Sequence, residues 1–143
     1  MKLLKLGTVK FEALQYRVKA VVTDNLGEYG CSLGFHEHSN RSPEATHFTN
    51  GYESIIAFSP FPSPGTIAHE CWHAVRTMLL NADAELDNET VAYHLGHLVD
   101  KISDMLHKNI DGMEDMPCTC PHCTEMVERT EPIVKKKKAL PRE

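Results

Sequence analysis

The sequence predicts an α+β fold, in which a small, mostly antiparallel sheet packs against two core helices and a cysteine-rich tail follows. Three observations lead to this prediction. Segments rich in β-branched and aromatic residues occupy the first part of the chain, with turn residues between them. Two stretches with apolar residues at helical spacing follow, at about 64–79 and 88–107. After Gly112 the composition changes to closely spaced cysteines and then lysines.

The strands are expected in the N-terminal part of the chain. Thr8–Leu14 and Tyr16–Thr23 carry β-branched and aromatic residues with partial alternation, and the second segment ends at the turn signal Asp24–Gly27. Cys31–His36 is expected to add a short strand, and Glu53–Phe58 is also β-prone. These segments together predict the sheet.

Three histidines, His36, His38 and His47, lie in the polar segment after the third expected strand. A second metal site is one interpretation of this group. Their spacing matches no known ligand pattern, so a solvated loop is the preferred interpretation.

The first helix is expected to begin near Pro64. Ser63 is a suitable N-cap, and a proline in the first helical position loses no hydrogen bond, because that N–H has no partner within the helix. An apolar stripe marks the side that packs in the core, and it consists of Ile67, Ala68, Cys71, Val75, Met78 and Leu79. His69 and His73 fall on a different side of the helix.

The pentapeptide His69-Glu70-Cys71-Trp72-His73 is the strongest functional signal. Histidines at positions i and i+4 project from one face of a helix, so that one metal ion can bind both imidazoles with Glu70 beside it. The alternative is that each histidine is an ordinary packing residue. Two histidines at helical spacing, away from the apolar stripe, favour zinc binding.

A catalytic zinc usually has three protein ligands and an open position for water. Glu89 is the best candidate for the third ligand. It lies in the first turn of the second expected helix, after the N-cap signal Asp87-Asn88, and on the side opposite the apolar stripe. The short link from Asn81 to Asp87 makes the helices near neighbours, and Gly96 would allow a close crossing. The alternative is an acidic residue placed by the helix dipole.

The two motifs together resemble the gluzincin group of zincin metallopeptidases, in a minimal form of the kind found among small phage and prophage proteins. The resemblance rests on His69–His73 and on Asn88-Glu89-Thr90-Val91-Ala92-Tyr93, and it covers about residues 53 to 107. It implies that Glu89 binds zinc and that an edge strand, Glu53–Phe58, holds an extended peptide substrate. The chain departs from larger members because it has no large N-terminal catalytic subdomain and no obvious propeptide.

This chemistry assigns a role to Glu70 and leaves one role open. Glu70 is expected to act as the general base that takes a proton from zinc-bound water and passes it to the leaving amine. A hydrogen-bond donor for the transition state is still needed. The candidates are Tyr93, which is preferred, His97, His47 and Arg76, and each of them has an alternative as a surface or packing residue.

Length and composition limit the class of protein. A chain of 143 residues fits one domain, expected at 1–111, and is too short for a two-lobed protease with a deep specificity pocket. The net charge of −5 argues against a general nucleic-acid binder. No signal peptide and no membrane-spanning run is visible, which predicts a cytoplasmic protein with no membrane partner, and its five cysteines are then reduced or bound to metal.

The tail, residues 112–143, carries Cys118, Cys120 and Cys123, which are predicted to bind zinc, with His122 as an alternative donor. One ligand is missing from such a site. It would come from Cys31, from a loop histidine or from a second chain. Alternatively, a tail thiolate occupies the open position on the catalytic zinc and keeps it idle. The lysine run at 135–138 is expected to be a solvated end.

The preferred hypothesis is therefore a zinc-dependent metallopeptidase acting on a peptide or protein substrate. The alternative is a zinc-binding protein, catalytically weak or inactive, that docks on a partner protein; hydrolysis of a non-peptide amide is a weaker third option. Glu70 favours the enzyme, because a structural zinc site has no need of a general base. The small size and the lack of an evident transition-state donor favour the alternative. The oligomeric state stays open.

Overall fold

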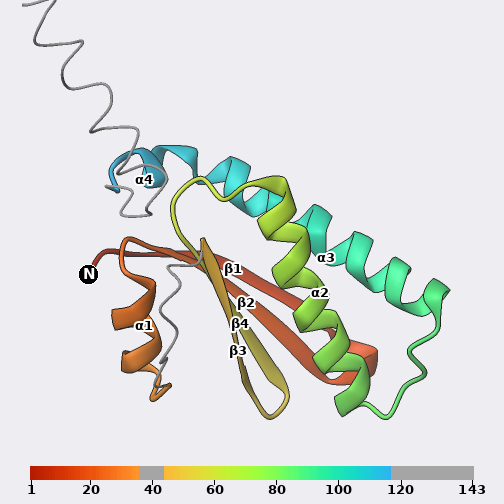
Figure 1. Ribbon diagram of the computed structural model, residues 1–143. Coiled ribbons are helices and arrows are strands. Elements are labelled where there is room, and N and C mark those ends of the chain that lie inside the picture. Colours follow the sequence, from red (N-terminus) through yellow and green to blue (C-terminus); the bar gives the residue numbers. More distant parts are fainter. Residues whose placement is uncertain (36–43, 117–143) are drawn as a thin grey trace, which may run out of the picture.

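Two antiparallel hairpins joined side by side form the sheet (Figure 1). In the computed structural model, which describes residues 1–35 and 44–116, β1 (Leu3–Phe11) pairs with β2 (Tyr16–Thr23), and β3 (Ala45–Asn50) pairs with β4 (Glu53–Phe58). The parallel pairing of β2 with β4 gives the strand order β1-β2-β4-β3. The α+β class and the mostly antiparallel sheet are confirmed, as a mixed sheet.

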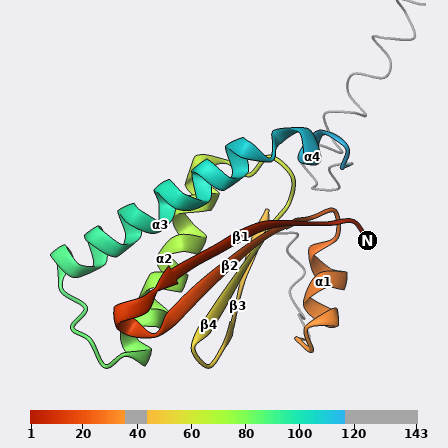
Figure 2. The same cartoon turned by 180° about the vertical axis from the view of Figure 1, so that it is seen from behind.

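Four α-helices accompany the sheet within residues 1–35 and 44–116. They are α1 (Leu26–Ser32), α2 (Pro64–Asn81), α3 (Asn88–Lys108) and α4 (Ile110–Glu114), and a short 3-10 turn, η1 (Glu12–Leu14), joins β1 to β2. Figures 1 and 2 show that α2 and α3 cover one face of the sheet, whereas α1 lies near the other face. No helix in the described part of the chain combines the length and apolarity needed to cross a membrane.

The main core lies between the sheet and the pair α2 and α3. The inner strands β2 and β4 are buried on both faces in their C-terminal halves, Ala20–Thr23 and Ile56–Phe58, which are mostly apolar. Near the start of β2, Arg17 and Lys19 are partly exposed on the face away from α2. The largest fully buried side chains in this core come from both layers and include Val18, Val22, Ile56, Phe58, Val75, Met78, Leu79, Leu98 and Ile102. This packing holds the outward face of α2 in a defined orientation over the sheet.

Local signals predicted both long helices correctly. The Ser63 hydroxyl accepts the N–H of Thr66 at 3.2 Å and caps α2, and the Asp87 carboxylate accepts the N–H of Thr90 at 2.8 Å and caps α3. One part of the predicted stripe is wrong, because Ala68 is exposed while Glu70 and Ala74 are buried. The stripe on α2 is thus turned slightly relative to the prediction.

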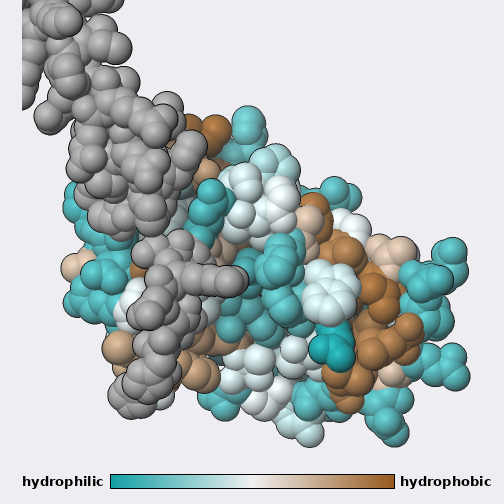
Figure 3. Space-filling model, in the orientation of Figure 1, coloured by the Kyte–Doolittle hydropathy of each residue, from teal (hydrophilic) through white to brown (hydrophobic). Residues whose placement is uncertain are grey.

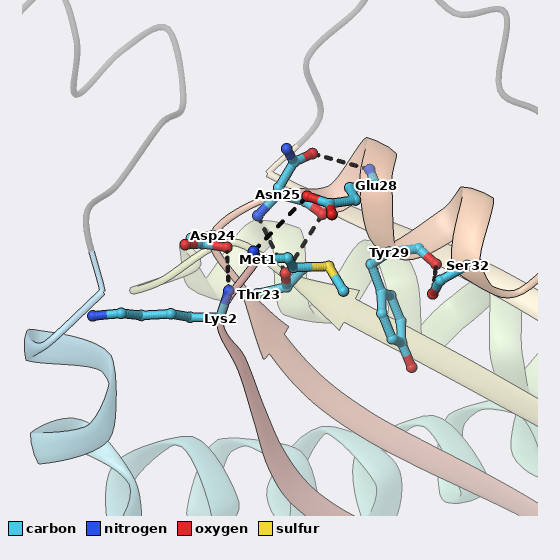
Figure 4. A network of polar contacts seen from close by, with 8 residues as sticks. All are labelled: Met1, Lys2, Thr23, Asp24, Asn25, Glu28, Tyr29 and Ser32. Carbon is cyan, nitrogen blue, oxygen red and sulfur yellow. Dashed lines mark hydrogen bonds and ion pairs between the residues drawn. The ribbon is translucent and has the colours of Figure 1, made fainter.

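The predicted strand Cys31–His36 is wrong as far as it is described, because α1 ends there. Asn25 follows β2 and is the N-cap of this helix, because its side chain accepts a hydrogen bond from the N–H of Glu28 at 3.0 Å (Figure 4). Its own N–H donates to the hydroxyl of Thr23 at 3.2 Å. The polar segment Asp24–Gly27, which was predicted as a turn, therefore leads into a helix. A side chain such as that of Asn25 can bind a nearby backbone N–H group in a turn and at a helix start alike.

The packed core continues beyond the expected domain boundary at residue 111. Met113 in α4 and Met116 just after it are buried against the same core as β1 and α3. Leu4 on β1 closely approaches Gly112, where an added Cβ would lie 3.0 Å from the leucine side chain. The first five residues of the expected tail thus belong to the folded body.

Two adjacent leucines near the end of α2 offer a matched test of this packing. Leu79 is fully buried, whereas Leu80 is 53% exposed. We expect Leu79→Ala to lower the free energy of unfolding by about 2–5 kcal/mol, because it removes core contacts and leaves a cavity. Leu80→Ala should change it by less than about 0.5 kcal/mol. Urea unfolding followed by circular dichroism measures both, and equal effects would contradict the packing of α2.

Candidate metal centre

The two motif histidines converge on the outward side of α2. The Nε2 atoms of His69 and His73 lie 3.1 Å apart, and their rings are inclined at 73°. Two nitrogens bound to one tetrahedral zinc at the usual bond length are about 3.3 Å apart. The pair therefore fits zinc chelation, and it equally fits a hydrogen bond between a protonated and an unprotonated nitrogen. The predicted convergence of these two side chains is confirmed.

Glu70 lies beside this pair but belongs to the buried side of the helix, with 9% of its surface exposed. Together with His69 it lines an open pocket of about 400 Å³ at the N-terminal end of α2, whose other residues are Glu44, Ala45, Ser63, Gly65 and Thr66. The carboxylate of Glu44, just before β3, accepts a hydrogen bond from the hydroxyl of Thr66 at 2.6 Å and so connects this segment to the start of α2. The pocket gives a small molecule or a peptide backbone access to both motif residues.

Glu89 is exposed in the first turn of α3, and the structure does not bring it to the two histidines. Within residues 1–35 and 44–116 there is no group of three His, Cys, Asp or Glu side chains arranged to hold a metal ion. The helix α3 meets α2 on the side of Trp72 and Arg76, which line a groove with α3 residues such as Val91. The role of Glu89 as a ligand stays a prediction from the sequence.

The predicted close crossing at Gly96 is not observed, because a Cβ built on this glycine would meet no atom within 4 Å. Gly96 therefore lies on a free surface of α3. The two helices approach each other through side chains, and Asn88 at the start of α3 lines the groove with Trp72 and Arg76.

The four candidate transition-state donors are placed very differently. Tyr93, the preferred one, is 74% exposed on α3. His97 packs on the ring of Phe11, and Arg76 lies over the ring of Trp72. His47 is the one of the four whose ring lies next to a motif histidine: its centroid is 6.2 Å from that of His73, and the rings are nearly parallel at 8°. Of the four candidates, His47 is therefore the best placed to contact a substrate at the histidine pair, and the preferred candidate Tyr93 is not.

His47 is in a strand and not in the predicted loop. It lies in the middle of β3, opposite Ile56 of β4, on the face of the sheet that α2 covers. Its Nε2 is 2.8 Å from the hydroxyl of Ser54, and that hydroxyl is 2.7 Å from the hydroxyl of Tyr16. The sequence contained a signal for this hairpin, because Asn50-Gly51 favours a turn between two strands. In the structure the two loop residues are Gly51, with a positive φ of 60°, and Tyr52.

Burial shifts the pKa of two residues near the site. It lowers the pKa of His47 to about 4, with a smaller contribution from the neighbouring His73, so this imidazole is neutral at physiological pH. Burial raises the pKa of the Cys71 thiol to about 12, and the charge of Glu70 adds to this. Cys71 therefore stays a neutral thiol in the core, which makes it unsuitable as a zinc ligand.

Acid should destabilise the metal-free protein through His47. The unfolded chain binds a proton at this residue below its usual pKa of 6.5, whereas the folded chain does so only near pH 4. The free energy of unfolding should therefore decrease as the pH falls through this window, and the full contribution is present above it. Urea unfolding at several pH values should show a smaller decrease for His47→Gln than for the unchanged protein; equal decreases would contradict the assignment.

The predicted tail ligands Cys118, Cys120 and Cys123, and also His122, lie outside the described residues, as do His36 and His38. Cys31, the proposed partner of the tail, is exposed on α1. Since α1 and α2 lie on opposite faces of the sheet (Figures 1 and 2), Cys31 is not part of the histidine site.

Comparison with known proteins yields no match: no protein-family model, no curated protein and no solved structure matches this chain.

Proposed function

We propose that this protein is a zinc-dependent peptidase of the gluzincin kind, in which His69 and His73 bind zinc and Glu70 acts as the general base. The observation that carries the proposal is the 3.1 Å separation of the two Nε2 atoms, because it is close to the separation that a shared zinc requires. The carboxylate of Glu70, on the intervening residue, supplies the group that a structural site would not need.

The roles of the residues follow from their chemistry. When bound, zinc lowers the pKa of a coordinated water molecule and polarises a carbonyl group. Glu70 accepts the proton of the attacking water and transfers it to the nitrogen of the scissile bond. The C–N bond then breaks and the amine leaves as a neutral molecule. The open pocket that Glu70 shares with His69 provides space for the water and for the substrate backbone.

The proposed substrate strand needs a correction. Glu53–Phe58, or β4, is an inner strand between β2 and β3, and its backbone groups are already paired. The edge nearest the histidines is β3, whose outer side has no strand partner in the described part of the chain. An extended peptide can pair with such an edge through backbone hydrogen bonds. We therefore assign the substrate to β3 and not to β4.

A specific observation also favours the second candidate, a zinc-binding protein that docks on a partner. A groove of about 400 Å³ between α2 and α3 is lined mainly by apolar side chains, including Trp72, Leu86, Val91 and Leu95. Trp72 is 42% exposed and its ring also contacts His73. Figure 3 shows the hydrophobic surface on this side of the molecule, next to the polar surface over α2. Such patches often bind other proteins.

The deciding experiment measures zinc-dependent cleavage. The full chain, loaded with one equivalent of zinc, is incubated with a mixture of unstructured peptides, and the products are identified by mass spectrometry. We expect new peptide ends that disappear when a chelator removes the metal and return when zinc is added. Zinc binding without any cleavage would overturn the peptidase and favour the docking protein.

A further inference from the structure

A chain of hydrogen-bonded side chains runs under α2 to the histidine site. Its first two members, Tyr16 on β2 and Ser54 on β4, are almost completely buried in an otherwise apolar interface. Their hydroxyl oxygens are 2.7 Å apart, and the Ser54 hydroxyl is 2.8 Å from Nε2 of His47, whose ring lies beside His73. Polar groups at such a depth are costly unless all their hydrogen bonds are made, so the chain constrains where each proton lies.

The direction of the hydrogen bonds follows from counting protons. The buried hydroxyl of Tyr16 has one proton, and its hydrogen-bond partner among the described residues is the Ser54 hydroxyl. Tyr16 must therefore donate to Ser54, because the opposite direction would leave a buried O–H without an acceptor. The proton of Ser54 is then directed to Nε2 of His47. A neutral imidazole that accepts at Nε2 carries its own proton on Nδ1.

The position of Nδ1 follows from the geometry of the ring. The two nitrogens of an imidazole point to nearly opposite sides, and Nε2 of His47 faces Ser54 on β4. Ser54 lies opposite Thr49, which is nearer the β3–β4 turn than His47. The Nδ1–H group therefore points away from this turn, toward the Ala45 end of β3, where Ala45 lines the pocket of His69 and Glu70. The ring also lies beside His73, within the reach of a group bound at the histidine pair.

We propose that the Nδ1–H group of His47 donates a hydrogen bond to the carbonyl oxygen of the peptide bond being cleaved, and that Ser54 and Tyr16 are positioning residues that hold His47 in this tautomer. The inference rests on the proposed peptidase function and supplies its missing transition-state donor. The donated hydrogen bond becomes stronger as negative charge develops on the carbonyl oxygen, so its loss should lower kcat more than it raises KM.

Two conservative variants of His47 separate the roles of its nitrogens. The amide nitrogen of His47→Asn can occupy the position of Nδ1, whereas that of His47→Gln lies nearer the position of Nε2. We expect kcat to fall about 10²–10³-fold in His47→Gln, with a small change in KM. The kcat of His47→Asn should be at least about tenfold higher than that of His47→Gln. His107→Gln, exposed near the end of α3, is the matched control and should be unchanged. Unchanged kcat in His47→Gln would overturn the inference.

The tautomer itself can be measured without any activity. In the zinc-loaded full chain with ¹⁵N-labelled histidine, long-range ¹⁵N–¹H spectra should show His47 protonated at Nδ1 and unprotonated at Nε2, and Ser54→Ala should weaken this preference. A proton on Nε2 would overturn the inference even if the protein is an active peptidase. If the unchanged protein cleaves no peptide, the proposed peptidase function is wrong. The donor role of His47 is then wrong as well, whichever tautomer is found.

Discussion

Replacing Glu70 by glutamine should nearly abolish peptide hydrolysis while zinc binding and folding are kept. Glutamine has the same shape as glutamate and fits the buried position beside Cys71, but its amide cannot accept the proton of the attacking water. A positioned general base contributes about 10²–10⁴-fold to such a reaction, so we expect kcat to fall by about this factor. The measurement is the rate of cleavage of the best peptide from the mixture, with zinc content determined on the same sample.

The control for this experiment is Glu85→Gln. Glu85 is exposed in the link between α2 and α3, so this substitution removes the same charge outside the core. It should leave both kcat and zinc content unchanged. If Glu70→Gln retains full activity, Glu70 is not the base and the peptidase mechanism is wrong. If the protein has a biological effect that Glu70→Gln leaves intact although hydrolysis is lost, the effect comes from binding, as the docking hypothesis requires.

Replacing His73 by alanine should remove the zinc site. Its Nε2 is one of the two nitrogens that converge at 3.1 Å, and a single histidine on the exposed side of a helix cannot hold zinc tightly. We expect about one zinc fewer per chain, measured by atomic emission after gel filtration. The rise in melting temperature that zinc causes in the unchanged protein should also disappear, because a ligand stabilises only the state that binds it.

His107→Ala is the matched control, because His107 is exposed near the end of α3 and should not affect the metal. Full zinc retention in His73→Ala would overturn the metal site. The same titration tests the third ligand: a lower zinc affinity in Glu89→Ala would mean that α3 moves its first turn to the histidines when metal binds, whereas an unchanged affinity would remove Glu89 from the site.

Features that depend on contacts within one or two helical turns could be predicted from the sequence. The starts of α2 and α3 were predictable from Ser63 and Asp87, because a capping side chain binds an N–H group only a few residues away. The convergence of His69 and His73 was predictable for the same reason, since a helix places positions i and i+4 side by side wherever it lies in the fold.

The way in which these elements meet could not be predicted from the sequence. The segment after β2 became α1 and not a strand, and β4 became an inner strand because β3 folded back along its outer side. The contact between His47 and His73, and the separation of Glu89 from both histidines, depend on which sides of α2 face β3 and α3. These directions are set by the packing of whole faces against each other, and no pattern within a single segment contains that information.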